Sequence, residues 1–187
     1  MGLIKSLTTE NRQRLEAIAS KKRSMLGFKA FETLPATILA KHFEAEVFTA
    51  ETFPNADSES IKLLSDPDKN WSAGIIRQNP LWIVHNSRHV PVRQQSNLMH
   101  EFAHIILKHK MVDRDPKTGL FQRRQQDEDE ATYLGGCLQI PRHGLLWAVQ
   151  KKMTVFQIAL QFNSSEAMVR FRGNVNGISL GDRYRIV

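Results

Sequence analysis

Cysteine is almost absent from this sequence, since Cys137 is the only one among 187 residues. A single cysteine cannot form a disulfide within the chain, which excludes a small secreted scaffold held together by disulfides. The sequence also lacks an apolar run of membrane-spanning length and a signal-peptide core near its start. We therefore expect a cytoplasmic protein with no membrane partner.

Composition and charge set the scale of the fold. With 187 residues, of which 41% are hydrophobic, the chain is long enough for one globular domain with a sizeable core. The net charge is +7, but the basic residues are spread over separate places, among them Lys21–Arg23, Arg123–Arg124 and Lys151–Lys152. Scattered charges of this kind predict a solvated surface rather than a dedicated nucleic-acid site.

One short segment contains a pattern of residues that is typical of a catalytic metal site. His100, Glu101 and His104 spell H-E-x-x-H within residues 98–107, which are otherwise apolar. Two histidines four residues apart lie on one face of a helix and can bind one zinc ion, which usually takes a third protein ligand and a water. A glutamate beside the first histidine can accept a proton from that water. The pattern predicts His100 and His104 as metal ligands and Glu101 as the catalytic base.

The alternative is a buried helix in which the histidines are satisfied core residues and Glu101 forms a local ion pair. Burying three polar side chains is costly unless they are hydrogen-bonded, paired or bound to a metal. Because all three occur together at the spacing of two ligands and a base, the metal site is the better interpretation.

Hydrophobic periodicity and turn residues predict an α+β fold. The H-E-x-x-H helix should begin near Pro91 and follow a β-hairpin, because two β-prone segments flank the turn sequence Gln78–Pro80. A short antiparallel sheet packed on this helix would form the floor of a cleft. The other predicted elements are helices at 10–26, 36–43, 125–140, 144–152, 155–162 and 166–175, a short helix after Asp57 and Ser58, a strand at 46–49, the hairpin strands at 71–77 and 81–85, and an exposed loop at 110–124.

The third metal ligand has to come from outside the motif. The metzincin pattern requires a glycine at position 107 and a histidine at 110, and is excluded because Leu107 and Lys110 stand there. A carboxylate from a following helix is the other common solution, and the acidic cluster Asp127–Glu130 opens the next predicted helix. Acidic residues at this place also suit the positive end of the helix dipole, which is their alternative explanation.

Two linked blocks resemble the ImmA/IrrE family of metallopeptidases. Residues 93–109 are similar to the family segment that contains its H-E-x-G-H helix, and residues 130–141 are similar to its E-A-N-x-F-A-A-x-L-L-M-P helix. The resemblance implies that Glu130, which opens the second block, is the third zinc ligand, with Asp127 as its rival three residues earlier. The sequence departs from the family pattern at Ala103, Thr132, Gly135, Gly136 and Gln139, none of which is a predicted ligand.

The resemblance also implies an activity. A small zincin-like domain of this family would be a zinc-dependent endopeptidase, with manganese or iron as possible replacements for zinc, that cleaves a regulatory protein such as a helix-turn-helix (XRE-type) repressor encoded nearby. The alternative is a non-catalytic zincin scaffold that binds a repressor, an antitoxin or DNA. Catalysis further needs a donor to the developing oxyanion, for which Tyr133, His109 and His143 are unranked candidates.

We divide the chain into an N-terminal helix (1–30), a zincin-like core (31–141) and a helical tail (142–187) packed on the core. Residues 154–172 resemble the family's helix-turn-helix-like tail, whose second helix could enter the major groove of DNA. Only Arg170 and Arg172 suit phosphate contacts there. The remaining large residues of the second helix have the pattern of packing residues, so nucleic acid is not expected to be the primary partner.

Overall fold

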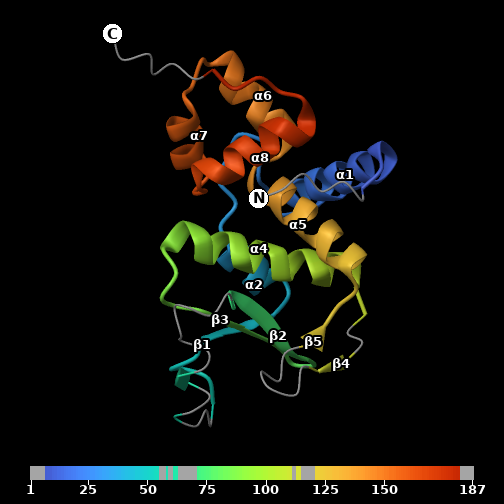
Figure 1. Ribbon diagram of the computed structural model, residues 1–187, viewed down its shortest axis with the longest axis vertical. Coiled ribbons are helices and arrows are strands. Elements are labelled where there is room, and N and C mark those ends of the chain that lie inside the picture. The colour runs from blue at the N-terminus through green and yellow to red at the C-terminus, as the bar shows by residue number, and fades with distance from the viewer. Residues whose placement is uncertain are drawn as a thin grey trace. The chain divides into compact units, whose positions relative to one another are not determined.

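The computed structural model describes residues 7–54, 58, 61–62, 71–110, 113–114 and 121–181. Its α+β fold confirms the predicted class (Figure 1). The helices are α1 (Thr9–Met25), α2 (Ala36–His42), α4 (Pro91–Leu107), α5 (Gln125–Gln139), α6 (Arg142–Gln150), α7 (Val155–Gln161) and α8 (Glu166–Asn176), and the strands are β1 (Glu46–Thr49), β2 (Ala73–Gln78), β3 (Leu81–His85), β4 (Asp113–Arg114) and β5 (Phe121–Gln122). The short helix predicted after Asp57 lies mostly outside the described residues.

The chain divides into two compact units. A sheet unit comprises Pro35–Ala131, and a helical unit comprises Met1–Leu34 together with Thr132–Val187. The two ends of the sequence therefore share one unit, whereas the sequence suggested three consecutive segments. Helix α5 begins in the sheet unit and ends in the helical unit.

The sheet unit contains a mixed three-stranded sheet of order β1-β3-β2. The hairpin of β2 and β3 is antiparallel as predicted, with Ile75 opposite Ile83. Strand β1 pairs with the other edge of β3 in parallel, with Val47 opposite Ile83. The sheet is therefore mixed, whereas we expected an antiparallel sheet. A parallel pair needs a long connection, which the chain between β1 and β3 supplies.

Helix α4 packs against both β2 and β3 and crosses the sheet (Figure 1). It starts at Pro91, whose missing N–H suits the first helical position. Its inner face includes the buried residues Met99, Phe102 and Ala103. Phe102 stacks on Phe43 with ring centroids 6.0 Å apart, and the Gln95 Oε1 accepts a hydrogen bond from the Ala36 N–H at 3.0 Å. These contacts bind α2 to α4 and hold the H-E-x-x-H helix in place.

Two buried arginines organise the helical unit. Arg172 Nε donates to the Ile140 carbonyl at 2.8 Å, and Arg23 Nη1 donates to the Leu138 carbonyl at 2.6 Å. These carbonyls lie at the C-terminal end of α5, where a helix leaves its last acceptors without intrahelical partners and favours positive charge. Arg172 is also paired with Glu16 of α1. The N-terminal helix and the tail thus meet at the end of α5.

The burial of these arginines corrects two expectations. Arg23 belongs to a basic run expected on the surface, and Arg172 is one of two residues expected to suit phosphate, but their exposed fractions are 1% and 0%. Arg170 is exposed and lies 3.7 Å from Glu166. The tail itself has the predicted helix-turn-helix form, and its expected packing residues Met168, Val169 and Phe171 are buried. Within the described residues, no helix has the length and apolarity needed to cross a membrane.

The Arg172–Glu16 pair yields a stability prediction. Replacing Arg172→Met should lower the free energy of unfolding by about 3–5 kcal/mol, because it leaves a largely buried carboxylate and a helix-end carbonyl without their partner. Arg170→Met, which breaks an exposed pair on the same helix, should cost less than about 1 kcal/mol. Urea denaturation of both variants measures the difference, and equal midpoints would show that the buried pair does not hold the unit together.

Candidate metal centre

Helix α4 presents His100 and His104 one turn apart, and the first turn of α5 adds a carboxylate. The two Nε2 atoms are 3.0 Å apart. Glu128 Oε2 lies 3.0 Å from His100 Nε2, and Glu128 Oε1 lies 3.4 Å from His104 Nε2. These side chains form a group of potential metal ligands whose donor atoms all lie within 4.8 Å of one another.

The spacing of this group fits a tetrahedral metal ion. Ligand atoms at about 2.0–2.1 Å from zinc in a tetrahedron are separated by about 3.3 Å, close to the 3.0–3.4 Å between the histidine and Glu128 atoms. Two imidazoles and one carboxylate are also the donor set of a common class of catalytic zinc site, which keeps a fourth position for water or substrate. The same donors accept manganese or iron.

The structure places Glu130 differently from our expectation. The carboxylate beside the two histidines is that of Glu128, whereas Glu130 Oε2 lies 3.6 Å from His109 Nε2. Asp127, the rival candidate, also faces His109, at 3.9 Å. Residues two positions apart on a helix lie about 200° apart around its axis, so the side chains of Glu128 and Glu130 leave α5 in nearly opposite directions. The geometry therefore supports Glu128 as the third ligand.

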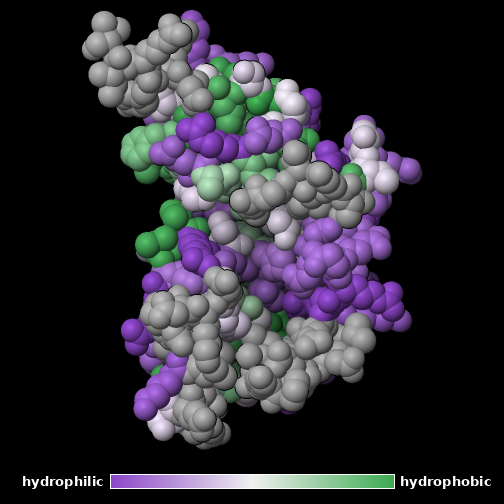
Figure 2. Space-filling model, in the orientation of Figure 1, coloured by the Kyte–Doolittle hydropathy of each residue, from purple (hydrophilic) through white to green (hydrophobic). Residues whose placement is uncertain are grey.

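Nothing in the sequence singles out Glu128. Four consecutive acidic residues, 127–130, cover every face of a helix. The hydrophobic pattern does not choose among them either, because nearly every residue of α5 after Ala131 is buried. Glu128 is distinguished from the other three acidic residues only by the packing of the first turn of α5 against α4, which brings its carboxylate to the two histidines. Figure 2 shows a hydrophilic surface over the described residues of this region.

Glu101, the predicted base, is 4% exposed and contacts an arginine that the sequence did not indicate. Arg123 Nη2 lies 3.3 Å from Glu101 Oε2, and Arg123 Nη1 lies 3.8 Å from Glu128 Oε1. The Arg123 side chain is 6% exposed, although the sequence predicted an exposed loop through residue 124. One guanidinium thus contacts both the candidate base and the candidate ligand.

Burial and charge set the protonation of these groups. Burial raises the pKa of Glu101 above its ordinary value, against the opposing effect of His100 and Arg123. Burial lowers the pKa of His104 to about 4, so its ring is neutral at pH 7 and keeps a lone pair for a metal. Burial alone would raise the pKa of Glu128, but hydrogen bonds from both histidines hold it well below its usual range. At neutral pH Glu128 is therefore an anion and His104 a neutral donor, as metal ligation requires.

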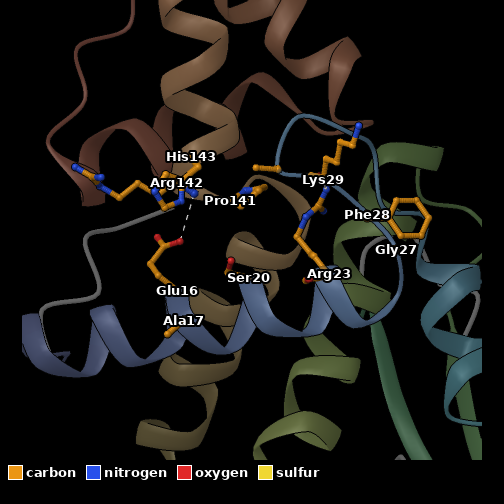
Figure 3. Close-up of a pocket in the computed structure, with 12 residues that line it drawn as sticks. Glu16, Ala17, Ser20, Arg23, Gly27, Phe28, Lys29, Pro141, Arg142 and His143 are labelled. Carbon is orange, nitrogen blue, oxygen red and sulfur yellow. Dashed lines mark hydrogen bonds between the residues drawn. The ribbon is translucent and has the colours of Figure 1, made fainter.

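The three candidate oxyanion donors, Tyr133, His143 and His109, each have different contacts. The Tyr133 hydroxyl donates to Glu16 Oε1 at 3.4 Å, and burial raises the pKa of Tyr133 to about 12. His143 is exposed and lines a cavity of about 700 Å³ in the helical unit, together with Ser20 and Arg142 (Figure 3). His109 contacts His104, with their Nδ1 atoms 2.9 Å apart.

A second cavity, of about 650 Å³, lies between the hairpin and the end of α4, next to His104. His104 and His109 line it, together with Ile75 and Leu81 of the hairpin and Lys108 at the end of α4. Of the three candidate ligands His104 lines this cavity, which therefore borders the candidate site on one side.

A small α+β domain with an H-E-x-x-H helix on a sheet and a glutamate from the next helix defines a metallopeptidase-type domain of the zincin class. The model of a peptidase family described as the IrrE N-terminal-like domain matches residues 56–174. The chain therefore belongs to the ImmA/IrrE family. A search of curated proteins found no significant match.

The choice of Glu128 can be tested by metal affinity. Glu128→Gln should weaken zinc binding at least tenfold, because it removes the charge of a direct ligand. Asp129→Asn, a matched change on the same turn, should leave the affinity within about twofold. Competition with a chromophoric chelator measures both dissociation constants. Equal zinc affinities for Glu128→Gln and wild type would show that Glu128 is not a metal ligand.

Proposed function

We propose that this chain is a zinc-dependent endopeptidase that cleaves a specific regulatory protein, such as a helix-turn-helix transcriptional repressor. The observation that carries the proposal is Glu101, a buried carboxylate directly adjacent to a three-ligand site. A purely structural metal site needs no base, and structural zinc is usually held by four protein ligands. A site with three ligands and a base has the composition required for hydrolysis.

The residues of the site divide the work of peptide hydrolysis. A zinc ion held by His100, His104 and Glu128 would polarise the scissile carbonyl and lower the pKa of a bound water toward about 7. Glu101 accepts the proton of the attacking water and passes it to the leaving nitrogen. Its raised pKa suits this task, because a base whose pKa lies closer to neutral also returns the proton more readily as an acid.

Arg123 supplies positive charge next to this base. Its Nε is buried and has no hydrogen-bond partner among the described residues, while its two Nη atoms face Glu101 and Glu128. We assign Arg123 as the donor to the carbonyl oxygen as negative charge develops on it.

The cavity of about 650 Å³ supports a preference at the cleavage site. Its walls include the apolar side chains of Ile75, Leu81 and Ile105, and Lys108 and Lys110 supply positive charge. A substrate residue that is apolar, or that carries a negative charge at the end of an apolar stem, matches this lining.

Membership in the ImmA/IrrE family supports a repressor as the substrate. The test is to mix the purified chain with the repressor encoded beside it, with and without a chelator, and to follow cleavage by gel electrophoresis and mass spectrometry. Cleavage that stops on chelation and returns with zinc supports the proposal. An uncleaved repressor that nevertheless forms a stable complex would favour the non-catalytic alternative.

Glu101→Gln should separate catalysis from binding. We expect a fall in kcat of about 10²–10⁴, the usual contribution of a general base, with zinc affinity retained within a few-fold because Glu101 is not a ligand. Cleavage rates and chelator competition on the same preparation measure the two quantities. A variant that still relieves repression in a reporter strain would refute the proteolytic function.

The pH profile tests the raised pKa of Glu101. Glu101 acts only when ionised, so kcat/KM should fall tenfold per unit as the pH drops below a pKa that lies above the ordinary 4.5. Arg123→Gln removes a positive charge that lowers this pKa, so the acidic limb should move to higher pH. A fluorogenic peptide assay between pH 4 and 9 records both profiles, and a limb that moves to lower pH in the variant would contradict the assignment.

A further inference from the structure

Behind the candidate ligand His104 lies a chain of polar groups that direct catalysis does not use. The Nε2 atom of His104 faces His100 and Glu128, and its other nitrogen, Nδ1, lies 2.9 Å from Nδ1 of His109. On the far side of His109, Nε2 lies 3.6 Å from Glu130 Oε2 and 3.9 Å from Asp127 Oδ1. The His109 side chain is 8% exposed and that of Glu130 is 12% exposed.

Metal ligation at His104 Nε2 allows one arrangement of protons along this chain. The lone pair of Nε2 goes to the metal, so the ring proton of His104 sits on Nδ1 and must be donated. The acceptor is His109 Nδ1, which must then be unprotonated. The proton of a neutral His109 is therefore on Nε2, the atom that faces the carboxylates of Glu130 and Asp127. Their distances exceed a direct hydrogen bond, so they act through charge or through one bridging water.

The backbone at the end of α4 holds His109 in this position. The His109 N–H donates to the His104 carbonyl at 3.1 Å, and the Lys108 N–H donates to the Ile105 carbonyl at 3.1 Å. This is the Schellman pattern, in which one residue takes the left-handed conformation and the chain turns back on the helix. Lys108 is that residue, with φ of 55°. The turn carries the ring of His109 back to the ring of His104.

We propose that His109, supported by Glu130 and Asp127, is a positioning residue that fixes the tautomer and ring orientation of His104 for the metal. The proposal rests on the proposed metal site. Glu130 then supports His109, which contacts the ligand His104, instead of binding the metal directly as the family resemblance implied. Outer carboxylates and histidines of this kind typically change metal affinity by 10–100-fold.

The test is metal affinity across a small set of variants. His109→Leu should weaken zinc binding by about 10–100-fold, whereas His109→Gln, whose Oε1 can still accept from His104 Nδ1, should recover part of that loss. His42→Leu, the same change at an exposed histidine of the sheet unit, is the matched control and should bind zinc as wild type does. Chelator competition gives the dissociation constants, and the d–d spectrum of the cobalt form should change in His109→Leu alone.

A double-mutant cycle separates positioning from general destabilisation. Glu130→Gln should weaken zinc binding in the wild-type background by several-fold but have no further effect when combined with His109→Leu, since Glu130 acts through His109. Asp129→Asn is the control for the acidic change. Additive losses in the double variant would overturn the proposal.

A measurement on the unmodified protein covers the case in which a variant fails to fold. In the zinc-loaded, ¹⁵N-labelled protein, a scalar coupling between Nδ1 of His104 and Nδ1 of His109 should be seen across their hydrogen bond. Absence of the coupling, or a proton on His109 Nδ1, would overturn the positioning role even if zinc binds. A wild-type chain that binds no zinc would overturn the metal site, and this proposal with it.

Discussion

The approach of the Glu128 carboxylate to the two histidines of α4 is the contact on which the site depends. It joins the first turn of α5 to α4, and without it the H-E-x-x-H helix would offer two ligands and no enclosed metal position. The contact also has an energetic consequence, because His104 is buried and His100 and Glu128 are partly so, and polar groups that lose hydration need one another, or a metal, as partners. Binding a metal satisfies all three at once, so metal affinity and the stability of the sheet unit are linked.

The local elements of the fold could be predicted from the sequence because their signals are local. Thr8, Thr154 and Ser165 cap the starts of three predicted helices, each accepting a hydrogen bond from a backbone N–H three residues on. The strand at 46–49 and the hairpin strand at 81–85 were likewise predictable. The parallel pairing of β1 was not, because it depends on a partner more than thirty residues away. The same limit applies to Arg23 and Arg172, whose partners lie on distant helices.

The candidate site shows the same division between local and tertiary information. His100, Glu101 and His104 are recognisable because one helical turn relates all three. Glu128 and Arg123 are not, because their roles come from packing between segments and each stands in a run of similar residues. The position of Glu130 at the start of a family-like block suggested that it binds the metal directly. In the structure its carboxylate faces His109 instead.

The Schellman turn at Lys108 has a consequence for how the site opens. His109 is bound twice to His104, through its backbone N–H and through its ring. Fraying of the last turn of α4 would therefore release a metal ligand and its support in the same event. The helix end and the metal site then form one cooperative unit of local unfolding, in which an occupied site would slow amide hydrogen exchange along residues 104–109. On loss of the metal, this turn would be the first part of the backbone to open.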